Sequence, residues 1–317
     1  NPLLSRQPGI VAFSKVLTES NTTHKSVPML MSDITAYNFD SIYHQKGIIT
    51  AFKEAGYQTA FFSNQRYNHS FIDFFGKEAD TFDFIKEDSL DSAYNPSDDE
   101  LLALVAKELS KGNQKQFIVL HTYGSHFNYR ERYPSEDAFF LPDYPVEAEV
   151  KYRDNLVNAY DNTIRYTDSF LSRLIHMLEE QHVDAAMLYT SDHGEDIFDD
   201  SRHLFLHASP VPSYYQLHVP FLIWMSDTYR EAYPEHWQTV TGNKDKDVSS
   251  SCSFFPTMLE LGGVQTSYRN DSSSVVSPLY TMKPRVYLND HNEPRPLDDL
   301  GMKQPDFQKC QVLGIKY

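Results

Sequence analysis

The sequence has few cysteines and no long apolar run. Cys252 and Cys310 are its two cysteines among 317 residues, and their spacing matches no metal-binding motif. A disulfide between them and two separate buried thiols are both compatible with such a pair. The longest apolar run, VPFLIWM at 219–225, is far shorter than the roughly 20 residues that cross a bilayer. We therefore predict no membrane-spanning helix within this sequence.

The sequence also has few basic residues relative to acidic residues. The 28 lysines and arginines are outnumbered by 44 acidic residues, which gives a formal net charge of −16. A nucleic-acid-binding protein or a protein held to anionic lipid by a basic face would show the opposite balance. An anionic substrate would have to be attracted locally, by a metal ion or by a few cations.

The composition is that of a folded protein with a sizeable core. Hydrophobic residues make up 40% of the chain and aromatic residues 14%, which suffices at this length. The first residues, NPLLSRQPGIV, lack the charged start and the cleavage site of a signal peptide. We expect the chain to be part of a longer protein. No repeat or low-complexity linker divides it, so we predict a single domain over residues 1–317.

Strand-like apolar clusters alternate with amphipathic stretches. The expected strands are 57–64, 116–122, 185–192 and 219–225, and the expected helices are 97–112 and 150–181. Residues 132–149 are rich in proline and acid and predict an irregular segment. This alternation indicates an α/β fold with a mostly parallel central sheet flanked by helices.

Polar residues follow three of these expected strands. Asn64 comes after the first strand, His126 ends the loop after the second, and Asp192 and His193 follow the third. Ligands bind at the carboxyl ends of such strands, so these residues are candidate substrate or metal ligands. An adjacent carboxylate and imidazole suit zinc or manganese. His207, in the segment HLFLHASP, is a further candidate at this edge.

A nucleophile is expected among small hydroxyl side chains. The segment ESNTTHKSVPMLMSD at 19–33 offers Thr22, Thr23 and Ser26 before an apolar, proline-containing helix. Such clusters also cap helices, and this second interpretation applies equally to all three residues.

Six motifs occur in an order that is specific to one family. They are THKSVP at 23–28, GSHFNYRERYP at 124–134, YDNTIRYTD at 160–168, SDHGE at 191–195, LHASP at 206–210 and HVPFLIW at 218–224. From residue 1 to about residue 265, the chain resembles the periplasmic catalytic domain of the lipid A phosphoethanolamine transferases. This family belongs to the alkaline phosphatase and sulfatase superfamily, so the resemblance implies an alkaline phosphatase-like fold.

The resemblance implies a role for each matching residue. Thr23 matches the nucleophile, which is also a metal ligand, and Asp192 and His193 match metal ligands. His126 and His207 match histidines around the phosphoryl group or a second metal, where they act in catalysis and substrate binding. The implied cofactor is Zn²⁺, with Mn²⁺ and a second divalent ion as alternatives. We expect these five residues to line one pocket, with Asn64 as a further substrate-binding residue.

The same resemblance implies an activity and a location. Phosphoethanolamine would pass from phosphatidylethanolamine to Thr23, and then to a phosphate of lipid A or of a core sugar in lipopolysaccharide. Such enzymes work at the periplasmic face of the inner membrane of Gram-negative bacteria. Their membrane region precedes the catalytic domain and is absent from this sequence.

Departures from the family pattern leave other functions open. Glu19 and Met29 stand where many members carry cysteines around the nucleophile. The family's first metal ligand, a glutamate on an earlier strand, is absent from this sequence, so three of the four ligands remain. We therefore expect this chain to bind zinc weakly, unless Glu19 or Glu195 completes the site. The alternative functions are a phosphodiesterase or sulfatase, a glycerol phosphate transferase and a metal-free binding domain. Sulfatase chemistry is disfavoured, because Leu30 stands where sulfatases need arginine. Residues 275–317 contain no motif that we can assign.

Overall fold

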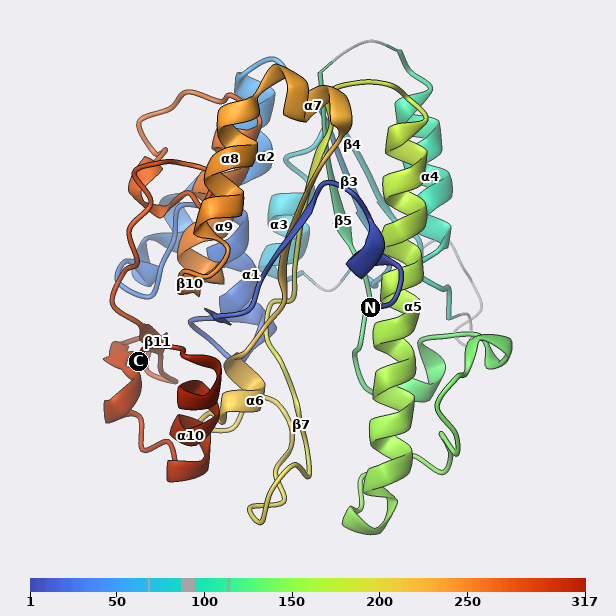
Figure 1. Cartoon of the computed structure of the whole chain (residues 1–317), viewed down its shortest axis with the longest axis vertical. Coiled ribbons are helices and arrows are strands. Elements are labelled where there is room, and N and C mark those ends of the chain that lie inside the picture. The colour runs from blue at the N-terminus through green and yellow to red at the C-terminus, as the bar shows by residue number, and fades with distance from the viewer. Residues whose placement is uncertain (68, 87–94, 113–114) are drawn as a thin grey trace. The chain divides into compact units, whose positions relative to one another are not determined.

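The computed structural model describes residues 1–67, 69–86, 95–112 and 115–317 (Figure 1). Contacts between Cα atoms divide these residues into two compact units. The first comprises Asn1–Pro8, Tyr57–His182 and Ile197–Leu206, and the second comprises Gly9–Gly56, Val183–Asp196 and His207–Tyr317. The single domain over 1–317 stays a prediction.

The first unit contains a parallel sheet. Strand β3 (Gln58–Ser63) lies between β4 (Thr81–Phe84) and β5 (Gln116–His121) and is parallel to both. Helix α4 (Glu100–Leu109) connects β4 to β5 and contacts β3, and α3 (Phe71–Gly76) follows β3. All but the first residue of β3 are buried, which is typical of a central parallel strand. The strands expected at 57–64 and 116–122 and the helix expected at 97–112 are confirmed.

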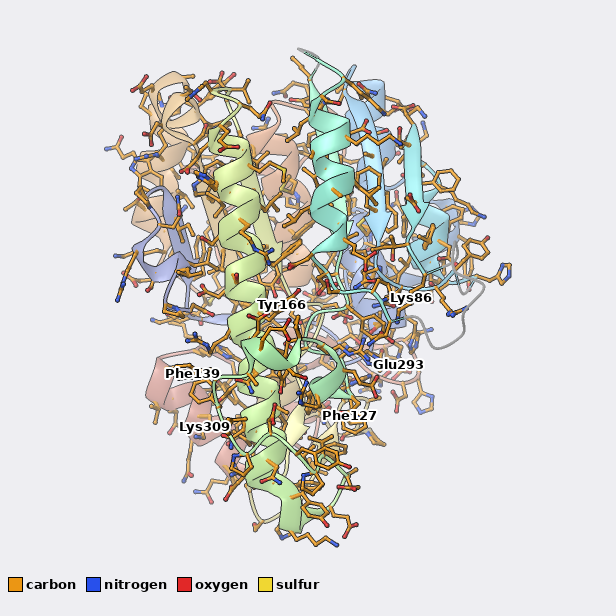
Figure 2. All side chains as sticks on the ribbon, turned by 90° about the vertical axis from the view of Figure 1, so that its right-hand side faces the viewer. Lys86, Phe127, Phe139, Tyr166, Glu293 and Lys309 are labelled. Carbon is orange, nitrogen blue, oxygen red and sulfur yellow. The ribbon has the colours of Figure 1, made fainter. Side chains whose placement is uncertain are left out.

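Helix α5 (Arg153–Glu179) is the long helix of the first unit. Its buried positions include Leu156, Phe170 and Leu174, which fall at helical spacing and confirm the helix expected at 150–181. The segment 132–149 is irregular apart from the short helix η4 (Ser135–Asp137). Figure 2 shows Phe139 of this segment beside α5, where the guanidinium of Arg165 lies 4.1 Å from the centre of its ring.

The second unit contains an antiparallel sheet. Strand β9 (Phe221–Met225) pairs with β1 (Ile10–Phe13) on one side and with β6 (Ala186–Thr190) on the other. Both pairings are antiparallel, which corrects the parallel orientation expected for 219–225. A parallel crossover usually needs a helix of some length, and residues 191–220 contain only the four-residue helix α6 (Tyr214–Leu217). The chain therefore returns into β9 at the end where it left β6.

Helices and one parallel pair of strands also contribute to the core of the second unit. Strand β2 (Val16–Leu17) pairs with β10 (Val248–Ser249), and α1 (Thr23–Met31) contacts α9 (Ser250–Leu261). Helices α2 (Ile48–Glu54), α7 (Asp227–Ala232) and α8 (Pro234–Asn243) also belong to this unit. Apolar side chains from β1, β2, β9 and β10 form one buried cluster that includes Phe13, Val16, Phe221, Ile223 and Val248.

The C-terminal residues, which carry no motif, are folded. They form the antiparallel pair β11 (Val286–Leu288) and β12 (Pro294–Pro296), followed by α10 (Gln304–Leu313). Tyr287, Leu297 and Cys310 pack with Leu17 and Leu217 in a second buried cluster of this unit. The other short elements are η1 (Leu4–Arg6), η2 (Phe39–His44), η3 (Tyr129–Glu131), η5 (Val150–Tyr152), β7 (Asp196–Ile197), β8 (Phe205–Leu206), η6 (Asp271–Ser273) and η7 (Leu297–Asp299).

The two cysteines are not paired with each other. Both lie in the described part of the chain and both are thiols, so of the two interpretations the separate thiols are confirmed. The Sγ of Cys252 donates to Oε1 of Glu19 at 2.8 Å, and burial raises the pKa of this thiol well above its usual value. Among the described residues, no helix is long and apolar enough to span a bilayer.

Candidate active site

The sheet of the second unit brings two polar segments to one edge. Strands β1 and β6 both run antiparallel to β9, so they are parallel to each other and their carboxyl ends lie at the same edge. The chain continues from β1 through β2 to Thr23 at the start of α1, and from β6 to Asp192 and His193. The Oγ1 of Thr23 lies 3.1 Å from Nε2 of His193. The sequence therefore correctly predicts that these residues meet.

Geometry separates Thr23 from the two other hydroxyl candidates. Ser26 is fully buried and its Oγ donates to the backbone carbonyl of Ser20 at 3.0 Å. Thr22 is the N-cap residue of α1 by position, but its side chain makes no capping hydrogen bond and pairs with the Ser20 hydroxyl at 3.2 Å. Of the three hydroxyl groups, that of Thr23 faces an imidazole.

The hydrogen bonds of His193 define its neutral tautomer. Its Nδ1 lies 3.0 Å from the carbonyl oxygen of Gly194, which can only accept. We therefore assign the ring hydrogen to Nδ1, so that Nε2 presents a lone pair. This lone pair can accept the hydroxyl hydrogen of Thr23 or bind a metal ion.

Asp192 supplies a buried carboxylate oxygen beside the same nitrogen. Its Oδ2 is 3.5 Å from Nε2 of His193 and has no hydrogen-bond partner among the described residues. A buried carboxylate oxygen without a partner is costly, and a cation at this position would satisfy it. Carboxylate, imidazole and hydroxyl side chains at these separations fit a zinc ion.

The fit depends on Thr23 as the third ligand. Within the described ranges, no group of three or more His, Cys, Asp and Glu side chains is placed to hold a metal ion. Glu19 does not fill this role, because its carboxylate accepts from the amide of Ala36 at 2.8 Å, from Cys252 and from Ser249 at 3.1 Å. Glu19 is buried, and this burial raises its pKa.

His207 packs against the same imidazole. The ring centres of His193 and His207 lie 4.0 Å apart, and Nδ1 of His207 lies 3.1 Å from Oε1 of Glu195. The Glu195 side chain is 7% exposed, so it fixes the orientation of the His207 ring from inside the protein. Sequence reasoning did not assign this role to Glu195, although the residue ends the SDHGE motif that carries Asp192 and His193.

The N-terminus of α1 adds a positive electrostatic field at Thr23. The first N–H groups of a helix point out of its N-terminus, where they favour an anionic group. Lys25 lies in the first turn and is 6% exposed, and its Nζ donates to the carbonyl oxygen of Asn289 at 2.6 Å. Burial lowers the pKa of Lys25.

The two remaining candidates belong to the first unit. Asn64 is 1% exposed, and its Nδ2 donates to the Pro96 carbonyl at 3.0 Å and to Oδ1 of Asp98 at 2.8 Å. These bonds fix the loop after β3. His126 is exposed after β5, with its ring centre 5.2 Å from that of Tyr123. The roles assigned to both residues stay predictions, and so does the expectation that all five residues line one pocket.

Gly194 provides a test of how tightly the His193 loop is packed. Its amide donates to the carbonyl of Gln216 at 2.9 Å, and a Cβ at this position would lie 2.1 Å from the carbonyl oxygen of Tyr215. We expect Gly194→Ala to lower the free energy of unfolding by about 1–3 kcal/mol or more, because the backbone must move. Urea denaturation measures this change.

Gly242 provides the matched control. It lies inside α8, and a Cβ there would meet no atom within 4 Å. Gly242→Ala should stabilise the protein by about 0.5–1 kcal/mol, because alanine favours the helical conformation. Equal effects of the two substitutions would contradict the close packing described for Gly194.

Comparison with known proteins identifies the family. The Sulfatase family model matches residues 1–264, so the chain belongs to the Sulfatase family. The chain is 28% identical over 287 residues to phosphoethanolamine transferase EptA of Salmonella typhimurium, covering 88% of this chain and 51% of that protein. It is 36% identical over 138 residues to Kdo(2)-lipid A phosphoethanolamine 7''-transferase of Escherichia coli, covering 42% of this chain and 24% of that protein. The resemblance to phosphoethanolamine transferases is thereby confirmed.

Solved structures confirm the α/β, alkaline phosphatase-like fold class. The C-terminal periplasmic domain of EptC from Escherichia coli, in complex with zinc, superimposes with a TM-score of 0.84 at 22% identity, over 95% of this chain and 85% of that chain. The soluble domain of lipooligosaccharide phosphoethanolamine transferase A from Neisseria meningitidis matches with a TM-score of 0.78 at 25% identity, over 89% and 86%. The chain spans about half the length of the EptA proteins that it matches.

Proposed function

We propose that the chain is the catalytic part of a metal-dependent phosphoethanolamine transferase. It moves phosphoethanolamine from phosphatidylethanolamine to a phosphate of lipid A or of a core sugar. The observation that carries this proposal is the hydroxyl of Thr23, which lies 3.1 Å from Nε2 of His193 at the N-terminus of α1. The activities named for the EptA relatives support the choice of group transferred.

In the first step, Thr23 acts as the nucleophile. Its Oγ1 forms a bond to phosphorus, the bond from phosphorus to the diacylglycerol oxygen breaks, and diacylglycerol leaves with a proton. The product is a phosphoethanolamine ester of Thr23. A free hydroxyl is a poor nucleophile, so loss of its proton must be favoured, and Nε2 of His193 is its hydrogen-bond acceptor where no metal ion occupies that nitrogen.

In the second step, an acceptor phosphate oxygen attacks the same phosphorus. The bond to Oγ1 of Thr23 breaks, and Oγ1 takes up the proton that the acceptor phosphate loses. The α1 N-terminus favours negative charge on the phosphoryl oxygens. His207 is held by Glu195 with its ring against His193, which supports a role in binding those oxygens. His126 and Asn64 complete the proposed set of substrate-binding residues.

Asp192, His193 and Thr23 are the residues that would hold zinc. The buried Oδ2 of Asp192 and the lone pair on Nε2 of His193 fit such an ion, and the zinc complex of a structural relative supports this choice. When bound, zinc would neutralise charge and lower the pKa of a neighbouring hydroxyl. Manganese, or a second divalent ion near His207, is the alternative.

The proposed location follows from the relatives rather than from this chain. Solved relatives are described as periplasmic domains, and one is an integral membrane protein whose match covers 86% of this chain and 52% of that chain. We propose that the full-length protein acts at the periplasmic face of the inner membrane of a Gram-negative bacterium. Both the donor and the proposed acceptor are lipids of the cell envelope.

Mass spectrometry of lipopolysaccharide tests the proposed transfer. Lipid A and core oligosaccharide are compared from cells that lack the full-length gene, carry it, or carry it with Thr23→Ala. We expect a phosphoethanolamine substituent only with the unmodified gene. A phosphorylated glycerol substituent would instead assign a glycerol phosphate transferase. Unchanged lipopolysaccharide together with hydrolysis of a phosphodiester or sulfate ester would assign a hydrolase.

A further inference from the structure

The C-terminal segment contacts the nucleophile segment at three places. The amide of Leu288 donates to the carbonyl of Glu19 at 2.7 Å, the hydroxyl of Tyr287 pairs with Oδ1 of Asn21 at 2.6 Å, and Lys25 donates to Asn289. All of these residues belong to the second unit. Strand β11 therefore runs beside the residues that precede and follow Thr23.

Asn21 is the contact closest to Thr23 on its N-terminal side. The residue is 1% exposed, and its Nδ2 donates to the Ser209 carbonyl at 3.0 Å and to Oε1 of Gln216 at 2.6 Å. Its backbone carbonyl accepts from the amide of Ala208 at 3.2 Å. Asn21 thus joins the Thr23 turn to the residues that follow His207.

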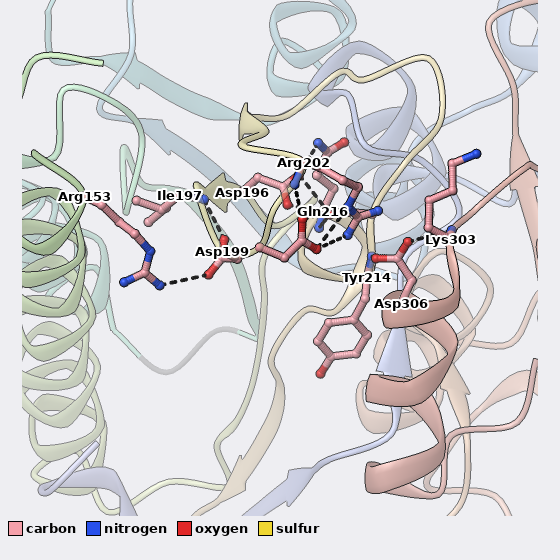
Figure 3. Close-up of polar contacts among 11 residues, drawn as sticks. Arg153, Asp196, Ile197, Asp199, Arg202, Tyr214, Gln216, Lys303 and Asp306 are labelled. Carbon is pink, nitrogen blue, oxygen red and sulfur yellow. Dashed lines mark hydrogen bonds and ion pairs between the residues drawn. The ribbon is translucent and has the colours of Figure 1, made fainter. Parts of the chain in front are cut away.

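Gln216 links the three segments of the site. Its side chain binds Asn21, its backbone carbonyl accepts from Gly194 beside His193, and its Nε2 donates to Oγ of Ser209 at 2.9 Å. The same Nε2 donates to Oδ2 of Asp196 at 2.6 Å (Figure 3). Gln216 is completely buried, so water does not compete for these bonds.

The directions of these hydrogen bonds require the Tyr287 hydroxyl to be a donor. Since Nδ2 of Asn21 faces two acceptors, the oxygen of its amide must face Tyr287, whose hydroxyl therefore donates. Burial raises the pKa of Tyr287, so this hydroxyl keeps its proton. Helix α6, which carries Gln216, is held in turn by α10, where Oδ1 of Asp306 accepts from the Tyr214 amide at 2.9 Å (Figure 3).

We propose that Tyr287 is a positioning residue for the transfer reaction, acting through Asn21 and Gln216 to hold Thr23 against His193. This inference rests on the proposed function for its chemistry. Without the Tyr287 hydroxyl, Oδ1 of Asn21 is buried without this donor, and its amide can reorient and release the Ser209 and Gln216 contacts. Small displacements of a nucleophile cost rate far more than they cost binding.

Tyr287→Phe in the full-length protein tests the proposal. The substitution removes one oxygen atom and keeps the packing of the ring. We expect kcat for transfer from a fluorescent phosphatidylethanolamine to fall about 10-fold or more, as for partners that orient other catalytic groups. KM should change less than about twofold, because the substituted residue does not bind substrate.

Tyr280→Phe is the matched control. Tyr280 is also a buried tyrosine of the second unit, and its hydroxyl donates to the carbonyl of Asp247 at 2.7 Å. Both substitutions should lower the melting temperature by similar amounts, but Tyr280→Phe should leave kcat within about twofold of the original. If Tyr287→Phe keeps the original kcat, or if both substitutions lower it equally, the positioning role is wrong.

A double-mutant cycle tests the route through Asn21. Asn21→Asp keeps the acceptor for Tyr287 and loses the donors to Ser209 and Gln216. If Tyr287 acts through Asn21, adding Tyr287→Phe to Asn21→Asp should lower kcat less than Tyr287→Phe does alone. Independent, multiplicative effects would overturn the proposed route. A protein without transferase activity before substitution would contradict the proposed function instead.

Discussion

Thr23→Ala should abolish phosphoethanolamine transfer while leaving the fold intact. Loss of a covalent nucleophile lowers turnover by about 10³-fold or more, since binding and charge stabilisation alone provide the remainder. Stability should change by less than about 0.5 kcal/mol, because the side chain of Thr23 is only partly buried and alanine favours a helix. Turnover of a fluorescent phosphatidylethanolamine and urea denaturation measure the two quantities.

Neighbouring hydroxyl groups provide the controls for this prediction. Thr23→Ser keeps a hydroxyl and should retain part of the activity, whereas Thr22→Ala should retain most of it, since that side chain pairs with Ser20. Mass spectrometry of the protein after a short incubation with donor lipid should find phosphoethanolamine on the peptide that contains Thr23. An active Thr23→Ala protein, or an adduct on Thr22 or Ser26, would assign the nucleophile to a different residue.

Asp192→Asn should remove zinc from the full-length protein without destabilising its metal-free form. An amide is a much weaker ligand than a carboxylate, so we expect zinc affinity to fall more than about 100-fold and transfer to fall with it. The metal-free protein should melt at an equal or higher temperature, because a buried carboxylate oxygen without a partner has been replaced. Elemental analysis and thermal denaturation after chelation measure both effects.

Asp168→Asn should show the opposite pattern. The carboxylate of Asp168 accepts from the amides of Leu3 and Leu4, each at 2.9 Å, so its loss should lower stability by about 1–3 kcal/mol. Zinc content should not change. If Asp192→Asn keeps its zinc, or if it destabilises the metal-free protein as Asp168→Asn does, then Asp192 is a structural residue and the metal site lies elsewhere.

The fold class could be predicted because its signals are local. Apolar clusters of strand length located β3, β5, β6 and β9, and helical spacing located α4 and α5. The antiparallel direction of β9 was missed. Nothing in the sequence of residues 191–220 indicates whether the chain crosses to the opposite edge of the sheet or returns to the edge that it left. Direction depends on what connects two strands, and this connection is almost free of regular structure.

The candidate site was predictable in part, where its residues lie in motifs. The motifs single out Thr23, Asp192, His193 and His207, and the structure brings these four side chains together in the second unit. The roles assigned to them stay predictions. Asn21, Gln216 and Tyr287 were missed, because single buried polar residues from distant segments follow no periodicity. Glu19 was noted as a departure from a cysteine position and as a possible zinc ligand, but its contact with Cys252, 233 positions away, was missed.

The contact between Asn21 and Tyr287, which are 266 positions apart, has a consequence for how the protein folds. Strand β1 likewise finds its partner only at residues 221–224. During synthesis the nucleophile segment therefore emerges long before residue 287 and cannot reach its final arrangement until that residue has been added. Contacts between such distant residues slow folding, because a long loop must close before they form. We expect the active site to be among the last parts of the molecule to form.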